Sequence, residues 1–565
     1  MSADTKARFK AYALLVLVII AVTAVVASAA RSPVDWRTID PHAATHPGTR
    51  TSGPATQDFS GTPPAEIQSA VAQVDRFFEQ NWHEAAIKPA PRASDLQIMR
   101  RLSLALCGTI PSLEEIRIFE SDHSPSRLDR WTARLLSDNR FADYFAERLA
   151  RSFVGTDIGQ VVVFRRDRFV DWLRQQLSQN TPYDQVARHV VSETGLWTDH
   201  PATNFITSAI ADGELDENKL AGRTVRAFLG QRMDCAQCHD HPFAEWKQAQ
   251  FEGLAALFGQ THSSLVGVED KAKMKYEVQD RKTLKKRVVE PAVPFHPEWL
   301  PTTGTRRERL AAWITHPQNR RFERATANRI WGLLFGRPLH RPVDDLPDPP
   351  TDDSRDVLDL IGADFREHHY DLRHMIRVIV ASRPFQVDSA QEEASPPKNA
   401  TEDANWSVFP MTRLRPEQLI GSILQSTSPR TIDQNSHLFV RAKRFFQENE
   451  FVKQYGDLGD NELDERSGTI AQALLRMNGK LASDALRAKD MSASSRITSF
   501  AGTDEACVEA CYLVALSRRP TKAENDYFVP QFACAEKSGP KDARGQVVED
   551  IFWSLFNSPE FSWNH

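Results

Sequence analysis

Apolar residues recur every three or four positions along most of this chain, which is the spacing of amphipathic helices rather than of strands. Residues 266–304 break the pattern, because they interleave β-branched with charged side chains and then run through several prolines. Such a segment favours a short β-hairpin or an extended basic arm. The pattern therefore predicts a mainly α fold, with two multi-helix domains at residues 91–265 and 305–565 on either side of that arm.

Several helix boundaries are marked by residues that cap or break helices. Ser112 and Glu115 have the spacing of a capping box, in which each side chain bonds the backbone N–H of the other residue. Asn180–Thr181–Pro182 divides the apolar segment 165–193 into two helices. A further helix, from about Asn218 to Arg232, leads directly into the sequence DCAQCHDHPF.

The N-terminal segment has the pattern of a membrane anchor. Residues 11–30 are apolar throughout, and the preceding residues 1–10 form a basic region expected to stay in the cytoplasm. About 20 apolar residues can cross a bilayer as a helix. We therefore expect an anchor in the inner membrane, with the body on the periplasmic side of the cell envelope. The alternative is a signal peptide cleaved after the small residues Ala27–Ser28–Ala29, which would leave a secreted protein.

Residues 31–90 are predicted to be mainly a linker, because they are rich in Pro, Gly, Ser and Thr. Toward the end of this segment, from Glu66, apolar residues return at helical spacing and predict a helix.

Composition narrows the possible functions. The 565 residues carry a formal net charge of −5, so neither sign is in large excess and no nucleic-acid partner is predicted. Six cysteines are too few for a disulfide scaffold. Cys507 and Cys511 lie one helical turn apart and are expected to face a core together. The sequence contains no G-x-S-x-G, P-loop or H-E-x-x-H motif, so no catalytic residue is predicted and enzymatic activity is left open. His368 and His369 are expected to lie in a turn between two helices.

The strongest chemical signal is the C-x-x-C-H pattern formed by Cys235, Cys238 and His239, which is the attachment signature of c-type haem. Two thiols separated by a short fixed loop can bond the two vinyl groups of one porphyrin, and the histidine that follows is placed to bind the iron. We therefore predict one covalent haem c per chain, with His239 as an axial ligand of the iron. The candidates for the opposite axial position are His262, His296, His316 and a methionine such as Met233. The alternative is that none of them binds, which would leave an open iron for small ligands.

Other interpretations of this segment stay open. His239 and His241 could bind zinc or another metal together with the two thiols, and Asp240 could act as a ligand or orient an imidazole. The two cysteines could instead be structural, as a disulfide or as buried thiols, while Asp240 caps the next helix. A thioredoxin-like redox pair is disfavoured, because no βαβ unit surrounds the cysteines.

Six ordered segments carry a resemblance to a known family. They are RRLSLALCGTIPSLEEI, FLGQRMDCAQCHDHPFAEW, LAAWITHPQNRRFERATANRIWGLLFGRPLHRPVDDL, YDLRHMIRVIVASRPF, YLVALSRRPTKAE and WSLFNSPEFSWNH. Together they resemble the planctomycete-type cytochrome c-associated proteins made of two paired domains of unknown function. The domain that contains CAQCHDHPF would come first, followed by its usual C-terminal partner.

The resemblance implies a role at the cell envelope. It supports a membrane-tethered, haem-binding protein that transfers single electrons or supports redox chemistry, with envelope redox or polysaccharide-processing proteins as partners. Many relatives carry a separate cytochrome c domain, whereas this chain has a single C-x-x-C-H. The alternative function is a haem-free envelope scaffold, or a module that binds glycan or protein, in which the segment is structural or holds zinc.

Overall fold

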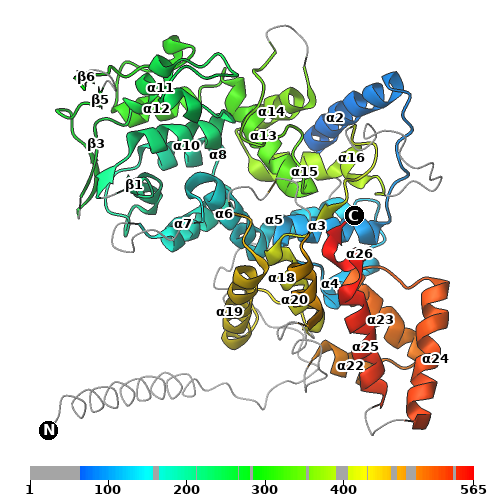
Figure 1. The fold of residues 1–565 in the computed structure, drawn as a ribbon. Coiled ribbons are helices and arrows are strands. Elements are labelled where there is room, and N and C mark those ends of the chain that lie inside the picture. Colours follow the sequence, from blue (N-terminus) through cyan, green and yellow to red (C-terminus); the bar gives the residue numbers. More distant parts are fainter. Residues whose placement is uncertain are drawn as a thin grey trace, which may run out of the picture. The chain divides into compact units, whose positions relative to one another are not determined.

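The prediction of a mainly helical fold is confirmed, and helices dominate the unit that spans residues 59–565 (Figure 1). The computed structural model describes residues 64–156, 164–211, 213–264, 266–279, 284–350, 355–389, 405–428, 430–459, 463, 468–478, 492–538 and 543–565. The predicted anchor at residues 11–30 lies outside these residues. Within them, no helix combines the length and the apolar character needed to cross a bilayer.

Short helices joined by tight turns make up the first half of this unit. They are α2 (Ala65–Glu84), α3 (Asp95–Cys107), α4 (Leu113–Ser121), α5 (Arg127–Ser137), α6 (Asn139–Val154), α7 (Arg166–Ser178), α8 (Tyr183–Ser192), α9 (Asn204–Thr207), α10 (Glu217–Leu229) and α11 (Gln248–Ala255). Three short 3₁₀ helices are η1 (Pro201–Thr203), η2 (Asp234–Gln237) and η3 (Pro297–Trp299).

The second half is built in the same way. Its helices are α12 (Arg306–Ile314), α13 (Arg320–Phe335), α14 (Val357–Glu367), α15 (Leu372–Ala381), α16 (Arg383–Gln386), α18 (Pro416–Thr427), α19 (Leu438–Tyr455), α20 (Ile470–Asn478), α22 (Ala493–Phe500), α23 (Asp504–Leu516), α24 (Lys522–Ser538), α25 (Ala543–Asn557) and α26 (Pro559–Ser562).

The described strands form four two-stranded antiparallel ladders. The pairs are β1 (Ile210–Ala211) with β2 (Glu214–Leu215), β3 (Thr261–Ser264) with β4 (Gly267–Asp270), β5 (Glu277–Gln279) with β6 (Lys286–Val288), and β7 (Thr412–Arg413) with β8 (Trp563–Asn564). The β5–β6 pair is the hairpin expected within the basic arm, and Val278 lies opposite Arg287.

The helix boundaries follow the capping residues. Ser112 accepts a hydrogen bond from the backbone N–H of Glu115 at 3.1 Å, and Glu115 accepts one from the backbone N–H of Ser112 at 2.9 Å. These two bonds form the predicted capping box of α4. The predicted break between α7 and α8 is also present, and Asn180 there has a left-handed φ of 53°. Helix α2 forms where apolar residues return from Glu66, inside the segment expected to be mainly a linker.

The core runs without interruption through both predicted domains. One cluster of buried apolar side chains extends from α2 through α15, and the fully buried Trp331 of α13 stacks on Phe78 of α2. A second cluster joins α18, α23 and α25 to Leu104 of α3 and includes Cys507 and Cys511, which confirms that these two cysteines face a core.

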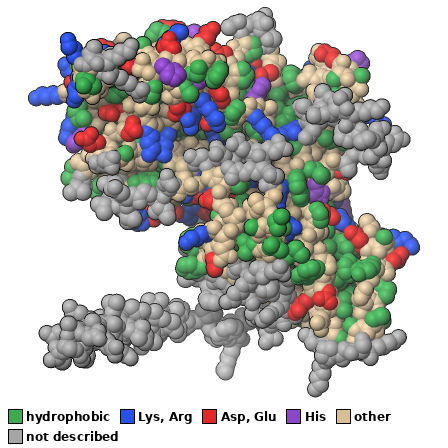
Figure 2. Space-filling view, in the orientation of Figure 1, with side chains coloured by type: hydrophobic (Ala, Val, Ile, Leu, Met, Phe, Trp, Pro, Cys, Tyr) green, Lys and Arg blue, Asp and Glu red, His purple; other side chains and the backbone are tan. Residues whose placement is uncertain are grey.

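Two buried arginines of α3 bind backbone from the C-terminal part of the chain. Arg100 donates to the carbonyl oxygens of Ala515 and Phe561, and Arg101 donates to those of Phe385 and Val387. Helix α3 therefore stands between elements that are hundreds of residues apart in the sequence. On the face seen in Figure 2, acidic and basic side chains are interspersed, in keeping with the small net charge.

Candidate functional site

Helix α10 and the backbone after it fix the position of the cysteine segment. The helix ends at Gly230, whose φ of 60° lets the chain turn away. The turn η2 then packs closely on the helix, because a Cβ at Gly222 would lie 2.7 Å from Oδ1 of Asp234. Arg226 of α10 donates to Asp234 at 2.8 Å. The turn η2 is therefore held against α10 by close packing and by an ion pair.

The two thiols of the segment are exposed. Ala236, between them, is fully buried and anchors η2, whereas Cys235 and Cys238 face solvent. The six cysteines of the chain all lie within the described residues, and they form no disulfide there. Cys235 and Cys238 are thus two exposed residues of one short, anchored turn.

His239 is held by the backbone. Its Nδ1 lies 2.6 Å from the carbonyl oxygen of Asp240. A carbonyl can only accept a hydrogen bond, so Nδ1 carries the proton and the lone pair of the neutral ring is on Nε2. Among the described residues, Nε2 has no hydrogen-bond or ion-pair partner. Metal-bound histidines are commonly oriented in this way, with the other ring nitrogen donating to a carbonyl.

The carboxylate of Asp240 serves the next helix rather than the imidazole. It accepts a hydrogen bond from the backbone N–H of Gln248, the first residue of α11, at 3.0 Å and lies 3.3 Å from Nζ of Lys247. The backbone bond to Gln248 and the bond to Lys247 hold the pKa of Asp240 below its usual range. A role for this carboxylate as a metal ligand stays a prediction.

His241 closes the loop after the motif. Its backbone N–H donates to the carbonyl oxygen of Trp246 at 2.8 Å, and its Nδ1 accepts from the backbone N–H of Phe243 at 3.2 Å. The next helix, α11, begins only after this loop, at Gln248. Phe243 itself is 94% exposed, so a large apolar ring stands beside the cysteine turn.

The structure does not gather the motif into a compact metal site. A set of three histidine, cysteine or carboxylate ligand atoms within 4.8 Å of one another occurs once among the described residues, and it lies elsewhere, at Asp364. Of the candidates for the opposite axial position, Met233 is buried at 1% exposure, and His296 and His316 both stack on Trp299.

The residues present fit a covalently attached haem. Two exposed cysteines and an exposed histidine whose Nδ1 is held by backbone lie within five residues, and Phe243, four residues after the histidine, is exposed as well. When attached, haem supplies one-electron oxidation and reduction at its iron. The chain would contribute the two sulfur atoms, the imidazole and the rigid turn.

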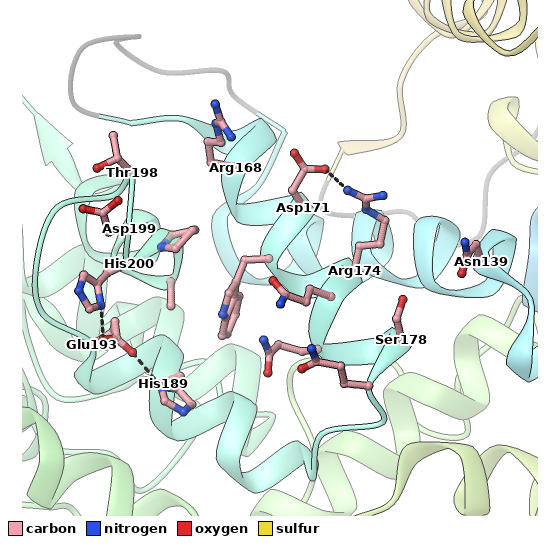
Figure 3. A pocket seen from close by; sticks show the side chains of 16 residues that line it. Asn139, Arg168, Asp171, Arg174, Ser178, His189, Glu193, Thr198, Asp199 and His200 are labelled. Atoms are coloured by element: carbon pink, nitrogen blue, oxygen red, sulfur yellow. Dashed lines mark hydrogen bonds and ion pairs between the residues drawn. The ribbon is translucent and has the colours of Figure 1, made fainter. Parts of the chain in front are cut away.

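A second candidate site is a cavity of about 770 Å³ between α7, the end of α8 and the following loop (Figure 3). Its walls combine one indole with amides and with charges of both signs. The main lining residues are Asn139, Arg168, Asp171, Trp172, Arg174, Gln175, Gln179, His189, Glu193, Asp199 and His200.

Glu193 is the electrostatic centre of this cavity, and Figure 3 shows it between two imidazoles. Nδ1 of His189 lies 2.8 Å from one carboxylate oxygen, and Nδ1 of His200 lies 2.9 Å from the other. The bond between His189 and Glu193 raises the pKa of His189 and lowers that of Glu193. The backbone at the end of α8 is also fixed, because the buried Arg307 of α12 donates to the carbonyl oxygen of Glu193 at 2.7 Å.

The sequence motifs do not point to this cavity, because its residues come from separate elements and match no motif. One local signal was available. His189 and Glu193 are four residues apart, which is the spacing of a side-chain pair on a helix. The contribution of His200 depends on the loop that brings the chain back.

Two family models match the chain in succession. Both are described as protein of unknown function, the first (DUF1549) over residues 73–263 and the second (DUF1553) over residues 306–454. The first match contains the cysteine segment and the whole of the cavity lining, and the second begins with α12. No curated protein and no solved structure matches the chain. Because the two models occur in the expected order and on either side of the basic arm, the chain belongs to the family of proteins that pair these two domains of unknown function.

Proposed function

We propose that residues 235–239 attach one c-type haem, and that the protein is an exported, membrane-tethered component of the cell envelope that transfers single electrons. The observation that carries this proposal is the state of His239. Its Nδ1 is fixed by the carbonyl oxygen of Asp240, so Nε2 keeps the lone pair of the neutral ring, on an exposed residue that directly follows two exposed cysteines.

The surrounding residues support attachment by holding the turn. Buried Ala236 and the bond between Arg226 and Asp234 keep η2 on α10, so the two sulfur atoms stay in one turn. Gln248 and Lys247 hold the carboxylate of Asp240, which fixes the carbonyl that orients His239.

The test is expression of the full chain in cells that have a c-type haem maturation system. The purified protein should be red, should keep its colour after acid-acetone extraction, and should gain the mass of one haem. Cys235→Ser/Cys238→Ser should lose all covalent haem, whereas Cys534→Ser, which removes another exposed cysteine, should keep it. A protein that is colourless or has no added mass under these conditions would show that the proposal is wrong.

His239 has a matched control in the same loop. His239→Ala should keep part of the attached haem but change the spectrum of the iron, because one axial ligand is lost. His241→Ala should leave that spectrum unchanged, because its Nδ1 is used by the backbone N–H of Phe243. Identical spectra for His239→Ala and the unmodified protein would rule out His239 as the ligand.

The cavity favours a second candidate function, binding of a neutral or weakly charged glycan without haem. A half-buried Trp172 can pack against the C–H face of a sugar ring while the amides around it bond hydroxyl groups. Titration with oligosaccharides should quench tryptophan fluorescence in the unmodified protein and in Trp553→Ala, but not in Trp172→Ala. Equal quenching in Trp172→Ala would exclude this cavity as the binding site.

A further inference from the structure

The turn between α14 and α15 brings together a second set of ligating side chains. Asp364 and His368 lie one helical turn apart at the end of α14, and His374 lies in the first turn of α15. One ligand atom from each of the three lies within 4.8 Å of the other two, and all three side chains are half-buried. The turn itself was expected from the sequence, but this gathering was not.

The distances suit a single ion. Nε2 of His374 lies 2.9 Å from Oδ2 of Asp364, and one ring nitrogen of His368 lies within 4.8 Å of the ligand atoms of both residues. Two ligands bound to one tetrahedral ion at 2.0–2.1 Å are about 3.3 Å apart. Small side-chain rotations are therefore enough to place a metal between these groups.

The hydrogen bonds of His368 leave a lone pair opposite a carboxylate. Its Nδ1 donates to the carbonyl oxygen of Asp364 at 2.8 Å, so Nε2 of the neutral ring has no proton. That nitrogen lies 3.7 Å from Oε2 of Glu66, in the first turn of α2. Glu66 is therefore placed to supply a further oxygen ligand beside this nitrogen, and the bond to the carbonyl is the usual support of a metal-bound imidazole.

The two imidazoles of the cluster lie face to face. The rings of His368 and His374 are stacked, with centroids 3.7 Å apart and planes 15° apart. Each ring places a nitrogen within 4.8 Å of a carboxylate oxygen of Asp364.

We propose that Asp364, His368 and His374, together with Glu66, bind one divalent transition-metal ion of the zinc class and thereby tie α2 to the α14–α15 hairpin. Two imidazole nitrogens and two carboxylate oxygens, with no thiolate, suit Zn²⁺, Co²⁺ or Ni²⁺. This site does not depend on the proposed haem site, and its test is independent of haem content.

The test is titration of the chelator-treated full-length protein with Co²⁺. Binding should produce visible d–d bands without the near-ultraviolet charge-transfer band of a cobalt–thiolate bond, which separates this site from Cys235 and Cys238. His374→Ala should weaken binding at least about tenfold, and Glu66→Gln should weaken it less. His369→Asn, in the same turn and outside the cluster, should bind like the unmodified protein.

Zn²⁺ should also raise the melting temperature of the unmodified protein and of His369→Asn, but not that of His374→Ala. Asp364→Asn and His374→Gln provide further variants in case His374→Ala does not fold. The proposal is wrong if all folded ligand variants bind Co²⁺ like the unmodified protein. It is equally wrong if the unmodified protein binds none, or binds it only through thiolates.

Discussion

Replacement of Arg307 by methionine should lower the free energy of unfolding by about 3–5 kcal/mol, which is the usual cost of breaking a buried ion pair. Arg307 is fully buried in the first turn of α12. Its Nε and one terminal nitrogen donate to the two carboxylate oxygens of Asp270, at 2.9 and 3.0 Å. Its other terminal nitrogen donates to the carbonyl oxygens of Val191 and Glu193. Methionine keeps much of the side-chain length and apolar volume but supplies no donor.

The magnitude follows from what the substitution leaves behind. The side chain of Asp270 is 9% exposed, so its charge would stay buried without a cation. The two carbonyl oxygens would also lose a donor, at about 1 kcal/mol each. Thr261 offers Asp270 only a long hydrogen bond of 3.4 Å, which compensates little.

Urea denaturation followed by circular dichroism measures the effect. Arg174→Met is the matched control, because Arg174 is about half exposed and its ion pair with Asp171 is worth less than about 1 kcal/mol. Arg307→Met/Asp270→Asn should recover part of the loss, since the buried charge is then absent. If Arg307→Met changes the free energy of unfolding by less than about 1 kcal/mol, with an unchanged m-value in urea, the buried ion pair of Arg307 is not an important source of stability.

Two further predictions concern a helix cap and a titrating pair. Ser112→Ala should lower stability by about 1 kcal/mol, because Ser112 accepts the first-turn N–H of α4, and Ser499→Ala on an exposed helix face should not; thermal denaturation distinguishes them. The pair of His189 and Glu193 should be most stabilising between about pH 4.3 and about pH 6.5, the ordinary pKa values of the two groups. Because the pKa of His189 is raised in the folded protein, protonated His189 contributes its full stabilisation below the unfolded pKa and loses it as pH rises through the folded pKa. Because the pKa of Glu193 is lowered in the folded protein, ionised Glu193 contributes its full stabilisation above the unfolded pKa and loses it as pH falls through the folded pKa. His189→Ala should therefore lose more stability relative to the unmodified protein at about pH 5.5 than at about pH 8.5, and equal losses at both values, or the same pH dependence in His83→Ala, would contradict this explanation.

Local features of the fold could be predicted from the sequence because they depend on neighbouring residues. The capping box of Ser112 and Glu115 and the break near Asn180 involve contacts within a few positions. The buried arginines of α3 could not be predicted in this way. Arg100 and Arg101 lie on an amphipathic helix, where charged residues normally mark the solvent face, and their partners are carbonyl oxygens more than 280 residues away.

The candidate sites also differ in whether they depend on neighbouring residues or on long-range packing. Cys235, Cys238 and His239 are adjacent in sequence, so their shared turn could be predicted without knowing the fold. The set of Asp364, His368 and His374 could be predicted only in part. The sequence places His368 in a turn, but it does not show that α15 brings His374 close to His368. The cavity around Glu193 needs three elements and the brace from Arg307, so its assembly depends on long-range packing.

The base of the cysteine turn gives a physical reason for the two family domains to occur in one chain. The backbone that leaves α10 is fixed by a segment of the second matched region. The N–H of Leu346 donates to the carbonyl oxygen of Gly230 at 2.8 Å, and the amide of Gln231 donates to the carbonyl oxygen of Leu346 at 2.9 Å. Arg232 donates to Asp344 at 2.8 Å. The first region thus supplies the thiols, while the second holds three consecutive residues just before them, so the turn is not complete in the first region alone. A group attached at this turn would be carried by the joint core of both regions, which is the rigid support that a fixed axial ligand requires.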